Sequence, residues 1–173
     1  MVDTVTLLLS LGTIGLQVLL LVGVILFFTK KGNHVLSWVG KRGVFFAYAL
    51  ALAGMVGSLY YSEVAKFAPC VLCWYQRIFV YANVFILGLA VYQKEKAVIP
   101  YASLLSIIGG IVALYHVCLP LLPAASATCS LVSDVSCTES YFTMFGYITI
   151  PVISLTSFVA MWLLLQLANK HVR

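Results

Sequence analysis

Five long stretches of this 173-residue chain are almost free of charge, and short polar segments separate them. The stretches lack the two-residue alternation of barrel strands, and lipid requires every backbone polar group to be hydrogen-bonded within the protein. A helix needs about 20 apolar residues to cross a bilayer, and each stretch is long enough. We therefore predict five membrane-spanning helices, at Thr4–Thr29, Gly43–Ser62, Cys70–Tyr92, Ala97–Cys118 and Tyr141–Asn169.

The first stretch has a second interpretation, as a cleaved signal peptide. Asp3 is the only charge before it, no basic segment precedes it, and its apolar length exceeds that of a signal peptide. These features favour a retained span. Residues 30–42 then form a short polar linker, and residues 119–140 a loop, because Pro120 and Pro123 make a continued helix unfavourable.

Two local patterns predict details of the packing. Ala49, Ala53 and Gly57 repeat every four residues, and small residues at this spacing let a neighbouring helix approach closely. Pro151 falls near the start of the last predicted helix, where it predicts a kink.

Composition and charge agree with a membrane protein. The chain is 63% hydrophobic and only 9% charged, against roughly 25% charged residues in a soluble domain. Its net charge of +5 could indicate nucleic-acid binding, but the positions of the basic residues argue otherwise. Alternating spans place eight of the ten on one side, at Lys30, Lys31, Lys41, Arg42, Lys94, Lys96, Lys170 and Arg173. By the positive-inside rule this side, with the C-terminus, is cytoplasmic.

Four cysteines fall on the opposite, extracytoplasmic side: Cys70 and Cys73 at the start of the third span, and Cys129 and Cys137 in the long loop. Disulfides persist in that compartment, whereas the cytosol keeps thiols reduced. Two thiol pairs on one oxidising surface can pass electrons between them. Cys118, near the same interface, is interpreted as a buried or free thiol.

Cys70 and Cys73 have the spacing of a readily reduced disulfide. A helix N-terminus favours the reactive thiolate form. Gln76 and Arg77 follow Cys73 at three and four residues and so share its helix face, where the guanidinium would stabilise an anion. The alternative is that Arg77 extends to lipid phosphate. Three aromatic residues are interpreted as interfacial belt residues, although one could lie beside a cofactor: Trp74, Tyr75 and Tyr81.

The segment Cys70–Arg77, with the sequence CVLCWYQR, resembles the signature of the bacterial disulfide-bond formation protein B family, DsbB. Cys129 and Cys137, followed by Tyr141 and the segment 145–151, are similar to its Gram-positive branch, BdbC. The resemblance covers about residues 43–168 and includes the segment 59–63 before the first cysteine pair. A vitamin K epoxide reductase-like enzyme shares the chemistry, but there the loop cysteines precede the membrane pair.

Residues 1–42 add a predicted N-terminal transmembrane helix and a basic cytoplasmic linker to the all-α fold, and this extra helix departs from the family pattern. The resemblance implies a four-helix antiparallel bundle at residues 43–173. It implies a bacterial plasma-membrane oxidoreductase that reoxidises an extracytoplasmic thioredoxin-fold thiol oxidase, DsbA- or BdbD-like. The electrons would pass to a membrane quinone, menaquinone or ubiquinone, in support of disulfide formation in exported proteins.

The resemblance also implies roles for individual residues. Cys129 and Cys137 would exchange with the partner, and Cys70 and Cys73 would face the quinone. Three further residues would bind the quinone: Gln76, Arg77 and His116. Two non-enzymatic alternatives stay open, a protein stapled by structural disulfides and a zinc site formed by the four cysteines.

Overall fold

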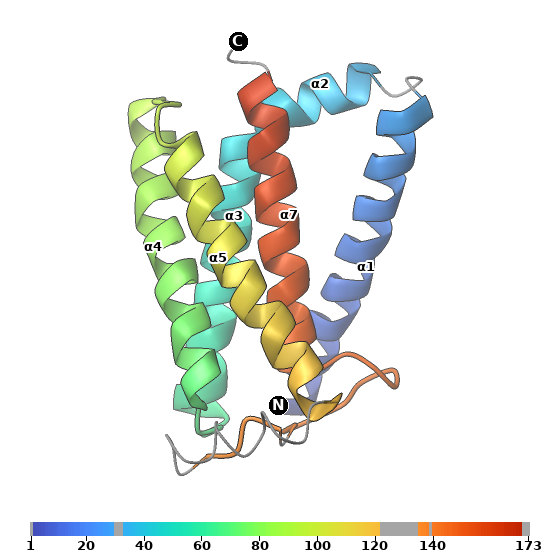
Figure 1. The fold of residues 1–173 in the computed structure, drawn as a ribbon, viewed down its shortest axis with the longest axis vertical. Coiled ribbons are helices and arrows are strands. Elements are labelled where there is room, and N and C mark those ends of the chain that lie inside the picture. The colour runs from blue at the N-terminus through green and yellow to red at the C-terminus, as the bar shows by residue number, and fades with distance from the viewer. Residues whose placement is uncertain (1, 30–32, 122–134, 139, 171–173) are drawn as a thin grey trace.

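The computed structural model describes residues 2–29, 33–121, 135–138 and 140–170. This part of the chain is mainly helical (Figure 1). The helices are α1 (Val2–Thr29), α2 (Asn33–Lys41), α3 (Gly43–Leu59), α4 (Val71–Gln93), α5 (Ile99–Cys118) and α7 (Ile150–Lys170). A π-helical turn, Tyr60–Val64, extends α3, and a 3-10 turn, Leu119–Leu121, follows α5. Five helices are long and apolar enough to cross a membrane, which confirms the predicted spans and a multi-pass membrane protein.

Helices α3, α4, α5 and α7 form the antiparallel core of the fold (Figure 1). Their inner faces meet at small and large apolar side chains that pack together, such as Ala47 with Leu87 and Leu165, and Ala51 with Phe158. The predicted four-helix bundle with one extra helix is therefore confirmed. The short connections from α3 to α4 and from α4 to α5 leave antiparallel neighbours as the natural arrangement.

Helix α1 stands beside this core and leans away from it toward the end that carries α2 (Figure 1). Side-chain hydrogen bonds hold it to α7 and the segment before α7. Gln17 donates from Nε2 to the Thr156 hydroxyl at 3.1 Å and accepts from the Tyr147 hydroxyl at 2.9 Å. The Tyr61 hydroxyl donates to Thr6 at 3.4 Å. Such bonds stabilise helix association in membranes by about 0.6 kcal/mol each.

Most of the predicted polar linker at residues 30–42 is helical and forms α2, Asn33–Lys41. This helix lies across the end of the bundle (Figure 1). Its sequence places apolar side chains, Trp38 among them, between polar ones, a pattern typical of interfacial helices. The Arg42 guanidinium lies 4.6 Å from the centre of the Trp38 ring. The charged residues around this segment conceal its amphipathic pattern, so the sequence indicates only a polar linker.

The start of the last span also differs from the prediction. Helix α7 begins at Ile150, nine residues after the predicted Tyr141, and Pro151 lies in its first turn. A proline is tolerated there because that N–H would have no partner within the helix. The predicted kink at Pro151 is therefore wrong. Before α7 the chain makes a tight turn in which Phe145 and Gly146 have φ angles of 53° and 81°.

The small-residue stripe on α3 does not lie at the centre of the bundle. Ala49 and Ala53 are exposed, whereas the alanines buried in the core are Ala47 and Ala51. At the far end of the stripe, a Cβ on Gly57 would lie 3.7 Å from Leu9 of α1. That end of the stripe therefore faces the extra helix and not the centre of the bundle.

Candidate functional site

The two CxxC cysteines lie where α4 begins. Cys70 precedes the helix in an extended conformation, and Cys73 lies in its first turn. Both are free thiols, and their sulfur atoms are 3.2 Å apart. Extended backbone before the helix lets the Cys70 side chain turn back over the first turn, which brings the two sulfurs together. The predicted position of this pair at a helix N-terminus is confirmed.

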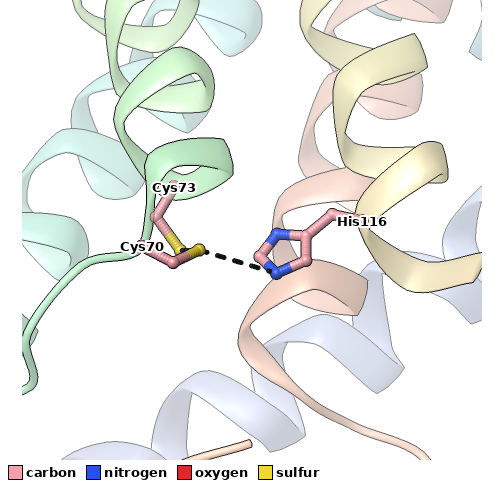
Figure 2. A group of neighbouring side chains, drawn as sticks. All are labelled: Cys70, Cys73 and His116. Carbon is pink, nitrogen blue, oxygen red and sulfur yellow. Dashed lines mark hydrogen bonds between the residues drawn. The ribbon is translucent and has the colours of Figure 1, made fainter. Parts of the chain in front are cut away.

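His116, near the end of α5, faces this pair (Figure 2). Its Nε2 atom lies 3.8 Å from the Cys70 sulfur, and its Nδ1 atom lies 3.0 Å from Nε2 of Gln76. An amide nitrogen only donates, so Nδ1 accepts and the proton of the neutral imidazole is on Nε2. Gln76 therefore fixes the tautomer that presents an N–H to Cys70. All three residues are at most 5% exposed.

Cys137, at the end of the long loop, also lies beside His116. The backbone oxygen of Cys137 lies 3.1 Å from Nε2 of His116. Cys137 is 5% exposed and packs with Cys70 and Leu119 in one buried cluster. It is disulfide-bonded. Cys129, the other predicted loop cysteine, lies outside the described residues. The structure thus brings one loop cysteine against the CxxC pair.

The surroundings of Cys70 favour its thiolate. A hydrogen bond from the Cys73 thiol lowers the pKa of Cys70 most, and the hydrogen bond from His116 lowers it further, while burial opposes them. The net result is a pKa well below the ordinary cysteine value. The reactive thiolate is thus favoured on Cys70, whose position before the helix also gives it the partial positive charge of the helix terminus.

Arg77 has partners that the sequence did not indicate. Its guanidinium donates to the backbone oxygen of Ser58 at 3.0 Å and lies 5.1 Å from the centre of the Trp74 ring. Arg77 and Cys73 line the same cavity, as their shared helix face predicts. A backbone acceptor such as Ser58 carries no residue-type signature, so the sequence could not have identified it.

That cavity has a volume of about 870 Å³ and extends from the cysteines along α1, α3 and α4. Tyr81 lines it, and the Tyr81 hydroxyl is buried with no hydrogen-bond partner among the described residues. The belt interpretation fits Trp74 and Tyr75, which are 54% and 50% exposed, but not Tyr81. Sequence periodicity could have indicated this, because Tyr81 lies one turn beyond Arg77.

The structure also bears on Cys118 and on the zinc alternative. Cys118 is a free thiol, half-buried and not part of the cavity lining, which agrees with its sequence interpretation. A zinc site of four cysteines needs four thiolates, and the disulfide of Cys137 removes one. Among the residues that the structure describes, Cys70, Cys73 and His116 form the group of potential ligands whose atoms lie within 4.8 Å of one another. We interpret this group through its redox chemistry.

Residues 41–168 match the family described as disulfide bond formation protein DsbB. The chain belongs to the DsbB family. It is 43% identical over 122 residues to disulfide bond formation protein C of Bacillus subtilis, covering 69% of this chain and 88% of that protein. A probable disulfide formation protein of Chlamydia caviae is 37% identical over 136 residues, covering 79% of this chain and 98% of that protein. No solved structure matches this chain.

The family match confirms the resemblance carried by the CxxC segment and includes each of the predicted site residues. It begins at residue 41, so DsbB-family membership accounts for the bundle of α3, α4, α5 and α7. Helix α1 lies outside the matched residues.

Proposed function

We propose that this DsbB-family protein is a quinone-dependent disulfide oxidoreductase that reoxidises an extracytoplasmic thioredoxin-fold thiol oxidase. The observation that carries the proposal is that Cys137 and Cys70 lie in one buried cluster and that His116 is bonded to both. Disulfide exchange requires a thiolate to approach a disulfide directly, and the burial of a loop cysteine beside the CxxC pair supports such an approach.

The proposed relay moves two electrons through four sulfurs. The reduced partner attacks the Cys129–Cys137 disulfide at Cys129 and leaves as a disulfide, so the loop becomes a dithiol. Cys137 then attacks Cys70 of the Cys70–Cys73 disulfide and releases Cys73 as a thiolate. Cys129 attacks Cys137 of the resulting mixed disulfide and releases Cys70. The loop disulfide is restored, and two electrons now reside on Cys70 and Cys73 as a dithiol.

The relay ends with the loop disulfide restored and the CxxC pair as a dithiol. Cys137 is disulfide-bonded, while Cys70 and Cys73 are free thiols. The enzyme in this state needs an electron acceptor before it can turn over again. A bound quinone supplies that acceptor by taking two electrons and two protons.

The residues at the cavity fit a quinone head group. A quinone presents two carbonyl oxygens on a flat apolar ring, so its site needs hydrogen-bond donors at an apolar cavity. The guanidinium of Arg77 has five N–H donors, and its bond to Ser58 leaves others for a ligand. The unpartnered Tyr81 hydroxyl is a further donor. His116 and Gln76 line the same end and orient the Cys70 thiol.

The proposed orientation places the cysteines outside the bacterial plasma membrane and the C-terminus in the cytoplasm. The first residues of α4 and the last residues of α5 form one end of the bundle, and α2 and the end of α7 form the other (Figure 1). Lys41, Lys94 and Lys170 belong to the second end. This distribution supports a cytoplasmic location for that end by the positive-inside rule.

Thiol trapping in quinone-depleted membranes tests the proposal. Acid quenching followed by alkylation should show reduced Cys70 and Cys73 accumulating when quinone is absent and becoming oxidised when it is restored. A protein stapled by structural disulfides would show the same thiol content in both membranes, and that result would refute the relay. A variant with Cys118→Ser provides a cleaner count, since this thiol lies outside the cavity.

A further inference from the structure

We propose that α1 forms one wall of the quinone site and that the isoprenoid tail of the quinone lies between α1 and α3. This inference rests on the proposed function, since it assigns an additional helix to the same cavity. It gives a role to the part of the chain that the family match does not cover.

The wall is visible in the lining of the cavity. One side consists of α1 residues between Leu8 and Leu19, and Gly12 and Gly15 lie within that stretch. At 1.5 Å per residue the stretch is about 16 Å long, a large part of the thickness of one leaflet. The cysteines and Arg77 line the same cavity at the end where α4 begins.

Small residues on both sides keep this space open. A Cβ on Gly12 or Gly15 would meet nothing within 4 Å, so both glycines border open space. On the facing helix, Ala53 and Gly57 also line the cavity. Large side chains at these four positions would fill the space between α1 and α3, which the present residues leave to a ligand.

Hydrogen bonds hold α1 in its position beside the bundle. Both amide atoms of Gln17 are bonded to the α7 side, through Thr156 and Tyr147. Thr6 is bonded to Tyr61, whose ring stacks on Phe67 close to Cys70. Helix α1 is thus hydrogen-bonded to the bundle on both sides of the two glycines, at Thr6 and at Gln17.

The chemistry of the cavity identifies its occupant. The donors Arg77 and Tyr81 line a space in which the thiols also lie, whereas the α1 wall is made of leucine and glycine with the hydroxyl of Thr13. The Thr13 hydroxyl is already bonded to the backbone oxygen of Leu9. A ligand that fits is therefore polar at the redox end and a long hydrocarbon along α1, which describes an isoprenoid quinone.

The experiment uses the full chain in nanodiscs with Gly12→Leu and Gly15→Leu as test variants. Gly23→Leu is the matched control, because a Cβ there also meets nothing within 4 Å and Gly23 lies outside the cavity lining. The probes are a naphthoquinone and a benzoquinone with short isoprenoid tails, and the readout is their Kd from quenching of tryptophan fluorescence. We expect Kd to rise roughly tenfold in the test variants and to stay at the wild-type value in the control.

Photocrosslinking gives a second readout that does not depend on activity. A naphthoquinone with an azido group on its tail should form adducts within residues 8–19, and excess unlabelled quinone should prevent them. If the test variants bind quinone as tightly as Gly23→Leu, α1 is not a wall of the site. The same conclusion follows if no adducts form on α1, or if unlabelled quinone does not compete with them because lipid occupies the space. Wild-type protein would then still bind quinone. Absence of any quinone binding or dithiol oxidation in the wild type would instead refute the proposed function.

Discussion

The imidazole Nε2 atom of His116 lies 3.1 Å from the backbone oxygen of Cys137. The same nitrogen lies 3.8 Å from the sulfur of Cys70, so one side chain is bonded to both cysteine pairs. A neutral imidazole whose Nε2 proton is shared between them holds the loop against α4. Gln76 is hydrogen-bonded to the other ring nitrogen, Nδ1, so the ring cannot turn away without losing the bond to Gln76.

We expect His116→Ala to slow disulfide exchange between the loop and the CxxC pair roughly tenfold or more, since hydrogen bonds to charged groups contribute about 1.5–3 kcal/mol. The measurement mixes quinone-free oxidised protein with a reduced thioredoxin-fold partner, then traps free Cys70 and Cys73 over time. His34→Ala is the control, because His34 belongs to α2 at the opposite end. Equal rates in the two variants would show that His116 does not position the loop.

Arg77→Gln should weaken quinone binding roughly tenfold through loss of charge-assisted hydrogen bonds, and KM for quinone should rise with it. Exchange between the loop and the CxxC pair should stay near the wild-type rate, because Arg77 bonds to Ser58 and stacks on Trp74 and so does not hold the loop. Lys66→Gln removes one positive charge from the exposed connection before α4 and serves as the control. An unchanged quinone Kd in Arg77→Gln would show that Arg77 does not bind the quinone and makes structural contacts only.

The sequence alone was sufficient to predict the five membrane spans and the start of α4. Charged segments such as Lys94–Lys96 interrupt the apolar stretches, and burial in lipid forces each stretch to be helical. The third span was predicted to begin at Cys70, one residue before the observed start of α4 at Val71. These features are local, so they can be derived from neighbouring residues alone.

The remaining features depend on contacts between distant segments. The bond between His116 and Cys137 joins residues that the sequence separates by a loop, and the bond between Arg77 and Ser58 ends on a backbone oxygen. Helix α7 starts at Ile150 because the preceding segment makes a tight turn at Gly146, which the apolar pattern conceals. No periodicity within one stretch could reveal such relationships.

The low pKa of Cys70 predicts a thiolate that survives in mild acid. A lowered pKa means that the thiolate is present above that value and is lost as the pH falls through it. In a variant with Cys118→Ser, Cys129→Ser and Cys137→Ser, only Cys70 and Cys73 remain as thiols. Thiolate absorbance at 240 nm should show one equivalent persisting at pH 6, below the ordinary cysteine value of about 8.5.

The control for this titration adds His116→Ala, which removes one cause of the lowered pKa. The thiolate of Cys70 should then be lost at a higher pH than in the parent variant, although the bond from Cys73 keeps its pKa below the ordinary value. Titration of both thiols near the ordinary value in the parent would contradict the assignment of the thiolate to Cys70.

Helices α5 and α7 pack closely at Gly109, and this contact predicts a specific stability effect. A Cβ on Gly109 would overlap the ring of Phe158, which is 0% exposed. Overpacking of this kind costs about 1–3 kcal/mol. Gly109→Ala should therefore lower the thermal unfolding temperature in detergent. Gly110→Ala is the matched control, since its Cβ would lie 3.6 Å from Phe158, at ordinary van der Waals distance.

A double-mutant cycle separates this clash from a general loss of helix packing. Phe158→Leu alone should destabilise the protein, because it leaves a cavity in the core cluster with Ala51 and Met161. Combined with Gly109→Ala, it should cost less than the sum of the two single changes, because the smaller side chain makes room for the added methyl group. Strictly additive effects would mean that the Gly109 contact with Phe158 does not limit how closely α5 and α7 approach.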